Sequence, residues 1–167
     1  MGVEIERKFR VVSDAWRDAA YRVVPMAQGY LNDHEAVRSG AQHASVRVRI
    51  EGDVAFLNIK SRAVGPSRQE FELPLPLDDA RALLALCVGD LVEKRRHLVR
   101  HGDHLWEVDE FLGANAGLVV AEIELEAADA PFARPVWLGD EVTDRVRYYN
   151  LALAAHPFSH WDAAERD

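Results

Sequence analysis

Cysteine, long apolar runs and positive charge are all scarce in this sequence. Cys87 is the only cysteine in 167 residues, so no disulfide forms within the chain, and a cytoplasmic location is expected. No run approaches the roughly 20 apolar residues that a membrane-spanning helix needs. Glu4, Glu6 and Lys8 stand where a signal peptide would begin its apolar core. These absences argue against a membrane as partner.

The net charge of −8 argues against nucleic acid as a partner, because a phosphate backbone would repel such a protein. The apolar fraction of 49% and the charged fraction of 29% are ordinary for a globular protein that buries a core. We therefore expect a single domain over residues 1–155, followed by a C-terminal tail over residues 156–167.

Apolar and polar residues alternate with a period of two along most of the chain, which is typical of β-strands. This alternation predicts about eight strands, over residues 3–12, 28–31, 45–50, 54–61, 68–74, 91–100, 104–111 and 118–127. Gly52 and Gly102 lie in three-residue gaps between strands, where they favour hairpin turns. The mostly short connections favour an antiparallel sheet.

Three segments have the features of helices instead. Residues 14–22 follow Ser13, residues 78–88 begin with two acidic residues and end before Gly89, and residues 140–154 carry apolar residues at helical spacing. Residues 32–44 are polar and lack a clear period, which predicts a loop.

Within each predicted strand, the charged residues fall on one face and the apolar residues on the other. In the first strand, Glu4, Glu6 and Lys8 alternate with Val3 and Ile5. The same separation recurs at Arg47 and Arg49, Lys60 and Arg62, Glu70 and Glu72, Lys94 and Arg96, Glu107 and Asp109, and Glu122, Glu124 and Glu126. Antiparallel sheets often present one polar face to water, so a solvated face remains an alternative for any single strand.

Most of these rows carry charges of one sign, which a solvated face seldom does. Like charges opposite each other in a sheet are destabilising, so the acidic rows need a cation and the basic rows need an anion. About eight strands form a barrel wide enough for a small ligand. We therefore expect an α+β fold: a closed antiparallel β-barrel with a charged interior and helices packed outside. Because three helices leave part of the outside uncovered, a homodimer is also plausible.

The run Glu4-Ile5-Glu6-Arg7-Lys8 resembles the ExExK signature of the CYTH, or triphosphate tunnel metalloenzyme, superfamily. The segment Gln28-Gly29-Tyr30-Leu31 and the ordered basic and acidic pairs extend this resemblance over nearly the whole chain. The bacterial inorganic tripolyphosphatases are the members that it resembles most. The resemblance implies a tunnel that binds a linear triphosphate with Mg²⁺ or Mn²⁺ and hydrolyses it, with inorganic tripolyphosphate as the expected substrate.

The resemblance also implies roles for individual residues. The implied metal ligands are Glu4, Glu6, Asp109, Glu122 and Glu124. The implied phosphate-binding residues are Arg47, Arg49, Lys60, Arg62, Lys94 and Arg96. Lys8 and Tyr30 resemble the family's pair for activating the attacking water, although an isolated tyrosine is more often a packed aromatic. For Glu70 and Glu72 two roles stay open, metal ligand and counter-ion of the basic side chains, and the counter-ion role is favoured.

Three alternative functions share the same triphosphate site. A class IV adenylate cyclase would bind ATP and attack with the ribose 3′-hydroxyl, and a thiamine triphosphatase would hydrolyse a different triphosphate. A sensor of polyphosphate or nucleotide would bind its ligand without turnover. Their products, or the lack of any, distinguish them.

Overall fold

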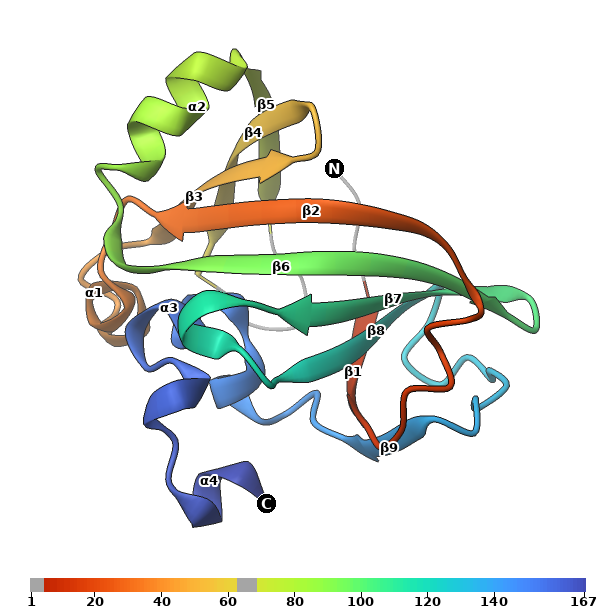
Figure 1. Cartoon of the computed structure of the whole chain (residues 1–167). Helices are drawn as coiled ribbons and strands as arrows, with labels where there is room; N and C mark the ends of the chain where they lie inside the picture. The colour runs from red at the N-terminus through yellow and green to blue at the C-terminus, as the bar shows by residue number, and fades with distance from the viewer. Residues whose placement is uncertain (1–4, 63–68) are drawn as a thin grey trace.

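The structure is a computed structural model that describes residues 5–62 and 69–167, built around one antiparallel sheet (Figure 1). In the described residues the strand order is β5-β4-β3-β2-β6-β7-β8-β1-β9. The strands are β1 (Ile5–Val11), β2 (Ala20–Tyr30), β3 (Ala44–Glu51), β4 (Val54–Ser61), β5 (Glu70–Leu75), β6 (Val88–His101), β7 (His104–Phe111), β8 (Val119–Leu125) and β9 (Leu138–Glu141). Every neighbouring pair is antiparallel, as predicted.

Most of the predicted strands are confirmed, and both predicted hairpin turns are present. Gly52 and Gly102 occupy these turns with φ angles of 57° and 58°, a region that glycine adopts without strain. The helix predicted over residues 14–22 is wrong, because β2 begins at Ala20 and pairs with both β3 and β6. Pairing of the start of β2 with β6 overrides a local helical pattern that is only a few residues long. β9 is an additional strand that the alternation does not predict.

The helices are short. They are α1 (His34–Ser39), α2 (Leu77–Leu84), α3 (Asn150–Ala155) and α4 (Ala163–Arg166), with 3-10 turns η1 (Gly113–Asn115), η2 (Val146–Tyr148) and η3 (Phe158–His160). α2 confirms the helix predicted over residues 78–88, although β6 already begins at Val88. The helix predicted over residues 140–154 is correct only for its last part. α1 lies in the predicted loop, where the Asp33 side chain accepts a hydrogen bond from the N–H of Ala36.

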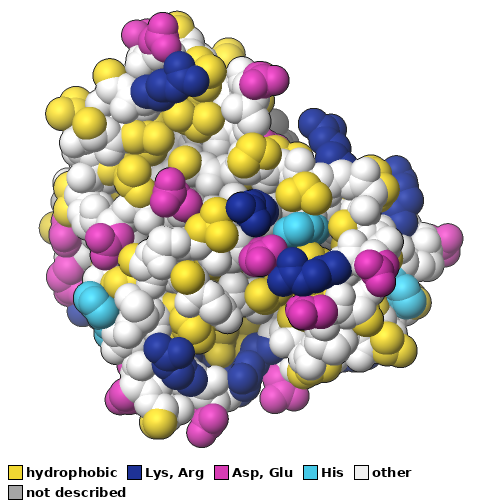
Figure 2. Space-filling model, in the orientation of Figure 1, with side chains coloured by type: hydrophobic (Ala, Val, Ile, Leu, Met, Phe, Trp, Pro, Cys, Tyr) yellow, Lys and Arg dark blue, Asp and Glu magenta, His cyan; other side chains and the backbone are white. Residues whose placement is uncertain are grey.

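Two apolar clusters cover the outer face of the sheet. α2 packs on β3 and β4, where Val48, Ala55 and Ala80 are buried together. Figure 2 shows apolar side chains gathered over α2 and the strands beside it. The second cluster surrounds Phe9 and Trp106, on the outer face of β1 and β7, and is covered by the segment 130–138. The expectation that the apolar faces point outward and are covered is therefore confirmed for these strands.

A third cluster fills one end of the opposite, charged face. Phe111 lies opposite Lys94 in the β6–β7 pair, so the two side chains share a face. Phe111 is buried with Leu153 of α3 and with Trp161, which is only 4% exposed. α3, Phe158 and Trp161 thus pack against the inner face, so the expectation of helices packed outside the sheet is wrong for α3. Apolar contacts hold this end of the chain in place.

The sheet curls around the space behind β2 and β6 in Figure 1. In the strand order, β6, β7 and β8 separate β2 from β1. Burial raises the pKa of Tyr30 on β2, and Lys8 on β1 is near enough for its charge to oppose that rise, so the curvature brings the two strands towards each other. β5 and β9 end the described sheet without pairing to each other, so the structure shows a curved antiparallel sheet and not a closed barrel. No helix among the described residues is long and apolar enough to span a bilayer.

Candidate functional site

The strand register brings nearly all of the predicted site residues onto one face, which we call the charged face. Residues directly opposite each other in an antiparallel pair point to the same side. Lys8 lies opposite Glu122, which in turn lies opposite Glu107, and Arg96 lies opposite Asp109. By the same rule the charged face also carries Glu6, Glu124, Lys94, Tyr30, Arg47, Arg49, Lys60, Glu70 and Glu72.

Two predicted residues are not placed on the charged face. Glu4 lies outside the described residues. Arg62 follows the end of β4, is exposed, and donates a hydrogen bond to the backbone oxygen of Arg38 in α1 at 3.1 Å. Arg62 therefore contacts the neighbouring helix and does not lie beside the other basic residues on the charged face.

A buried ion network lies at the centre of the charged face. Asp109 is 0% exposed and Lys94 is 2% exposed, and the Lys94 ammonium donates to the Asp109 carboxylate at 2.5 Å. Arg96 donates to both oxygens of Asp109 at 2.8 Å and contacts Glu122 at 3.3 Å. Burial alone would raise the pKa of Asp109, but the two cations hold it well below its usual range. Both carboxylate oxygens of Asp109 are thus occupied by cations.

Lys8 extends this network towards β1. Its ammonium donates to Glu122 and lies 3.3 Å from Glu6, and the side chain is almost completely buried. Burial opposes the charge on Lys8, but Glu122 and Glu6 outweigh it and raise the pKa of Lys8 above its ordinary value. Lys8 therefore carries a proton in this arrangement. Its ammonium also lies 5.2 Å from the ring centre of Tyr149, which the sequence analysis does not place in the site.

The β1–β8 end of the charged face is acidic. Glu6 and Glu124 lie directly opposite each other and are both exposed. Burial raises the pKa of the neighbouring Glu107. No group of three or more acidic, histidine or cysteine side chains is arranged as a metal site in the part of the chain that the structure describes. The chemistry nevertheless fits a divalent cation, because opposed carboxylates repel each other and supply the hard oxygen donors that Mg²⁺ prefers.

The β3–β4 end of the charged face is basic. Arg49 lies 3.0 Å from Glu72, and Lys60 lies 3.2 Å from Glu70, which agrees with the expectation that these carboxylates act as counter-ions. Burial lowers the pKa of Arg49. Arg47 has no ion pair with a carboxylate among the described residues, and it opposes the rise in the pKa of Tyr30 through its charge and a hydrogen bond. The positive charge of Arg47 is therefore available to bind an anion at this end of the charged face.

Two amide side chains complete the basic end, and neither is among the predicted site residues. Gln28 lies opposite Arg49, and Asn58 lies opposite Arg47. Asn58 donates a hydrogen bond to Glu72 at 2.9 Å. The period-two rule places Asn58 on the same face as Lys60 and Gln28 on the same face as Tyr30. The sequence therefore predicts the face on which both amides lie, but a search restricted to charged residues misses them.

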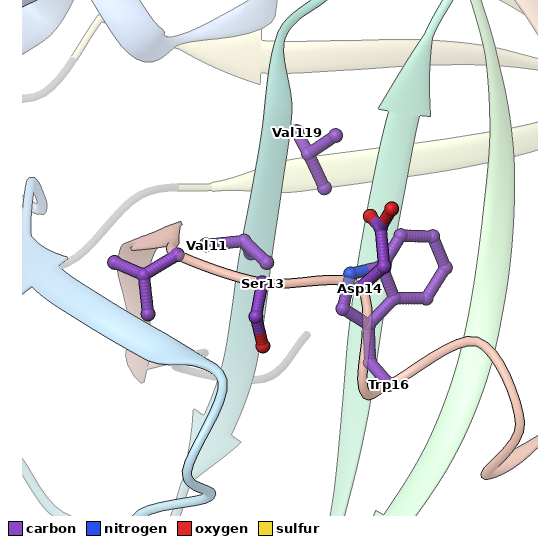
Figure 3. A pocket seen from close by; sticks show the side chains of 6 residues that line it. Val11, Ser13, Asp14, Trp16 and Val119 are labelled. Carbon is purple, nitrogen blue, oxygen red and sulfur yellow. The ribbon is translucent and has the colours of Figure 1, made fainter.

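Two cavities lie elsewhere on the surface. One of about 410 Å³ lies beside residues 145–147. The other, of about 320 Å³, is shown in Figure 3 and is lined by Val11, Val12, Ser13, Asp14, Trp16 and Val119. Neither is lined by a residue that the sequence analysis assigns to the site. The candidate site is therefore the charged face itself.

Comparison with known proteins identifies the family of the chain. The family model described as CYTH domain matches residues 2–154. The chain is 41% identical over 162 residues to an inorganic triphosphatase of Acetivibrio thermocellus, covering 96% of this chain and 99% of that protein. It is 36% identical over 154 residues to an inorganic triphosphatase of Nitrosomonas europaea, covering 90% and 96%. The crystal structure of an inorganic triphosphatase matches with a TM-score of 0.70 and 34% identity, covering 92% of this chain and 95% of that one.

Proposed function

Because the chain belongs to the CYTH domain family, we propose that it hydrolyses inorganic tripolyphosphate with Mg²⁺ or Mn²⁺ as cofactor. Two similar proteins are named inorganic triphosphatases, and they match this chain over nearly its whole length. The observation that carries the proposal is the charged face, which has one basic end, one acidic end and a buried ion network between them. A long, highly charged anion with a bound dication complements this arrangement.

Phosphoryl transfer depends mainly on positioning and on electrostatic stabilisation of the phosphate oxygens. Arg47, Arg49 and Lys60 supply the basic end, and Arg96 supplies a further guanidinium at the centre. Lys94 supports Arg96 by sharing Asp109 with it. We assign the triphosphate to these groups, inside the curved sheet, which would close around it as a barrel. Arg62 would reach this row only by leaving its contact with α1.

The carboxylates suited to hold the metal are Glu4, Glu6 and Glu124, joined by Glu122 if the metal displaces Lys8 and Arg96 from its two oxygens. A bound dication would neutralise phosphate charge and lower the pKa of a bound water. Asp109 is a weaker candidate than the sequence analysis expects, because Lys94 and Arg96 already occupy its oxygens. We assign Asp109 to positioning Arg96.

Lys8 and Tyr30 remain the proposed pair beside the attacking water. In the structure Lys8 is protonated, because Glu122 and Glu6 stabilise its charge. A cation held by those carboxylates would weaken this stabilisation and would lower the pKa of Lys8. The same group would then accept the proton of the water, while the Tyr30 hydroxyl helps to orient that water.

The test is phosphate release by the purified protein from tripolyphosphate, ATP and thiamine triphosphate, each with Mg²⁺, with Mn²⁺ and with chelator. We expect metal-dependent release that is fastest on tripolyphosphate. Cyclic AMP and pyrophosphate from ATP would instead identify an adenylate cyclase. Tight binding of tripolyphosphate without release would identify a sensor.

A further inference from the structure

Gln28 is a buried polar side chain whose hydrogen-bonding capacity is unused. It lies on the charged face of β2, between Arg49 of β3 and Val92 of β6, and is 1% exposed. Neither its amide nitrogen nor its amide oxygen has a hydrogen-bond partner in residues 5–62 and 69–167. Buried amides are nearly always paired in native proteins, because an unpaired one destabilises the fold. The unpaired amide of Gln28 therefore points to a bound ligand as its hydrogen-bond partner.

The neighbours of Gln28 indicate the chemistry of that partner. Arg49 lies directly opposite Gln28, and Arg47 lies two residues before Arg49. Each has a buried guanidinium Nε with no hydrogen-bond partner in the part of the chain that the structure describes. With the Gln28 amide, three neighbouring side chains thus present unused N–H donors at the basic end of the charged face. Several donors that include two cations fit the oxygens of an anion such as a phosphoryl group.

We propose that Gln28 is a substrate-binding residue that donates its amide N–H to a phosphoryl oxygen of the triphosphate held by Arg47 and Arg49. This inference rests on the proposed function and adds a neutral group to its binding site. Asn58 differs from Gln28, because its amide N–H already donates to Glu72, the counter-ion of Arg49. Asn58 therefore orients the arginine through Glu72, whereas Gln28 meets the substrate directly.

The test is Gln28→Met, which keeps the length of the side chain and removes its polar atoms. Removing an unpaired buried amide should leave the melting temperature of the ligand-free protein unchanged or higher. The KM for tripolyphosphate should rise about tenfold, with kcat changed less than about threefold, since the lost hydrogen bond contributes to substrate binding. Tripolyphosphate should also raise the melting temperature less than it does in the wild type.

Met26→Leu is the matched control, because Met26 lies two residues away on the same strand and face and is apolar and buried. We expect this control to leave KM unchanged. Gln28→Glu is a second variant, in which a carboxylate replaces the donor, and it should raise KM more than Gln28→Met does. It keeps the test valid if the methionine variant does not fold.

A lower melting temperature with unchanged KM in Gln28→Met would show that Gln28 is structural and would overturn the inference. In that case Arg49→Ala would still raise KM, and the proposed function would stand. If the wild-type protein neither binds nor hydrolyses tripolyphosphate, the proposed function itself fails. The two failures are thus distinguished by the wild-type and Arg49→Ala measurements.

Discussion

Asp109→Asn separates the two roles considered for this carboxylate, counter-ion and metal ligand. Asp109 is completely buried and accepts hydrogen bonds from Lys94 at 2.5 Å and from Arg96 at 2.8 Å. Asparagine keeps the shape of the side chain but removes its charge. Lys94, which is 2% exposed, then loses the charge that neutralises it.

Removing one partner of a buried ion pair costs about 3–5 kcal/mol of the free energy of unfolding. Burial already lowers the pKa of Lys94, so the variant can lose the Lys94 proton instead of burying an unpaired charge. The expected loss therefore lies near the lower end of that range, at about 3 kcal/mol. For a chain of 167 residues this corresponds to a melting temperature lower by roughly 6–12 °C.

The measurement is urea and thermal unfolding in the presence of chelator, followed by tryptophan fluorescence. Glu110→Gln is the matched control, because Glu110 is the next residue and forms a partly exposed pair with Arg17 at 2.9 Å. That pair contributes at most about 1 kcal/mol. A metal ligand that lacks its metal would behave differently, since its removal relieves repulsion between carboxylates. Unchanged or higher stability of Asp109→Asn in chelator would therefore refute the counter-ion role.

Three further predictions concern the two ends of the charged face and the ion pair between Arg7 of β1 and Glu141 of β9. Glu6→Gln combined with Glu124→Gln should reduce metal-dependent phosphate release at least roughly 100-fold; an unaltered dependence on metal concentration would remove both residues from the metal site. Arg49→Ala should raise the KM for tripolyphosphate roughly 10- to 100-fold, because a charge-assisted hydrogen bond is lost; an unchanged KM would place Arg49 outside the site. A hydrogen bond from Arg7 lowers the pKa of Glu141 from 4.5 to about 2, so the stability it contributes is full above pH 4.5 and is lost as the pH falls towards 2. Glu141→Gln should make the midpoint of urea unfolding depend less on pH between pH 2 and 4.5. An unchanged pH dependence of the midpoint would contradict that assignment.

The parts of the fold that follow from local patterns were predictable. Alternation of apolar and charged residues reports which side chains share a face, whatever the strand order, so the charged face could be assembled before any pairing was known. The elements that were missed depend on distant partners. β2 is a strand at Ala20 because β6 pairs with it, and β9 (Leu138–Glu141) exists because the edge of β1 accepts it. The residues of β2 near Ala20 and of β9 do not themselves show which strand will pair with them.

The site shows the same division. The residue types and their order identify carboxylates for a cation and basic groups for phosphates, but composition does not say which charges neutralise one another. Only the tertiary structure pairs Asp109 with Lys94 and Arg96, and thereby makes it a weaker candidate for a metal ligand.

The sequence by itself determined the antiparallel strands and their two chemically distinct faces, because a period of two and the charge of a side chain are local properties. The resemblance of its motifs to the CYTH family added the triphosphate chemistry. The tertiary structure decided which charges are buried together, which end of the charged face is filled by Trp161 and α3, and that Gln28 is left unpaired. These outcomes depend on burial and on distances between residues far apart in the chain. Both arise only when the sheet curls and brings its strands together.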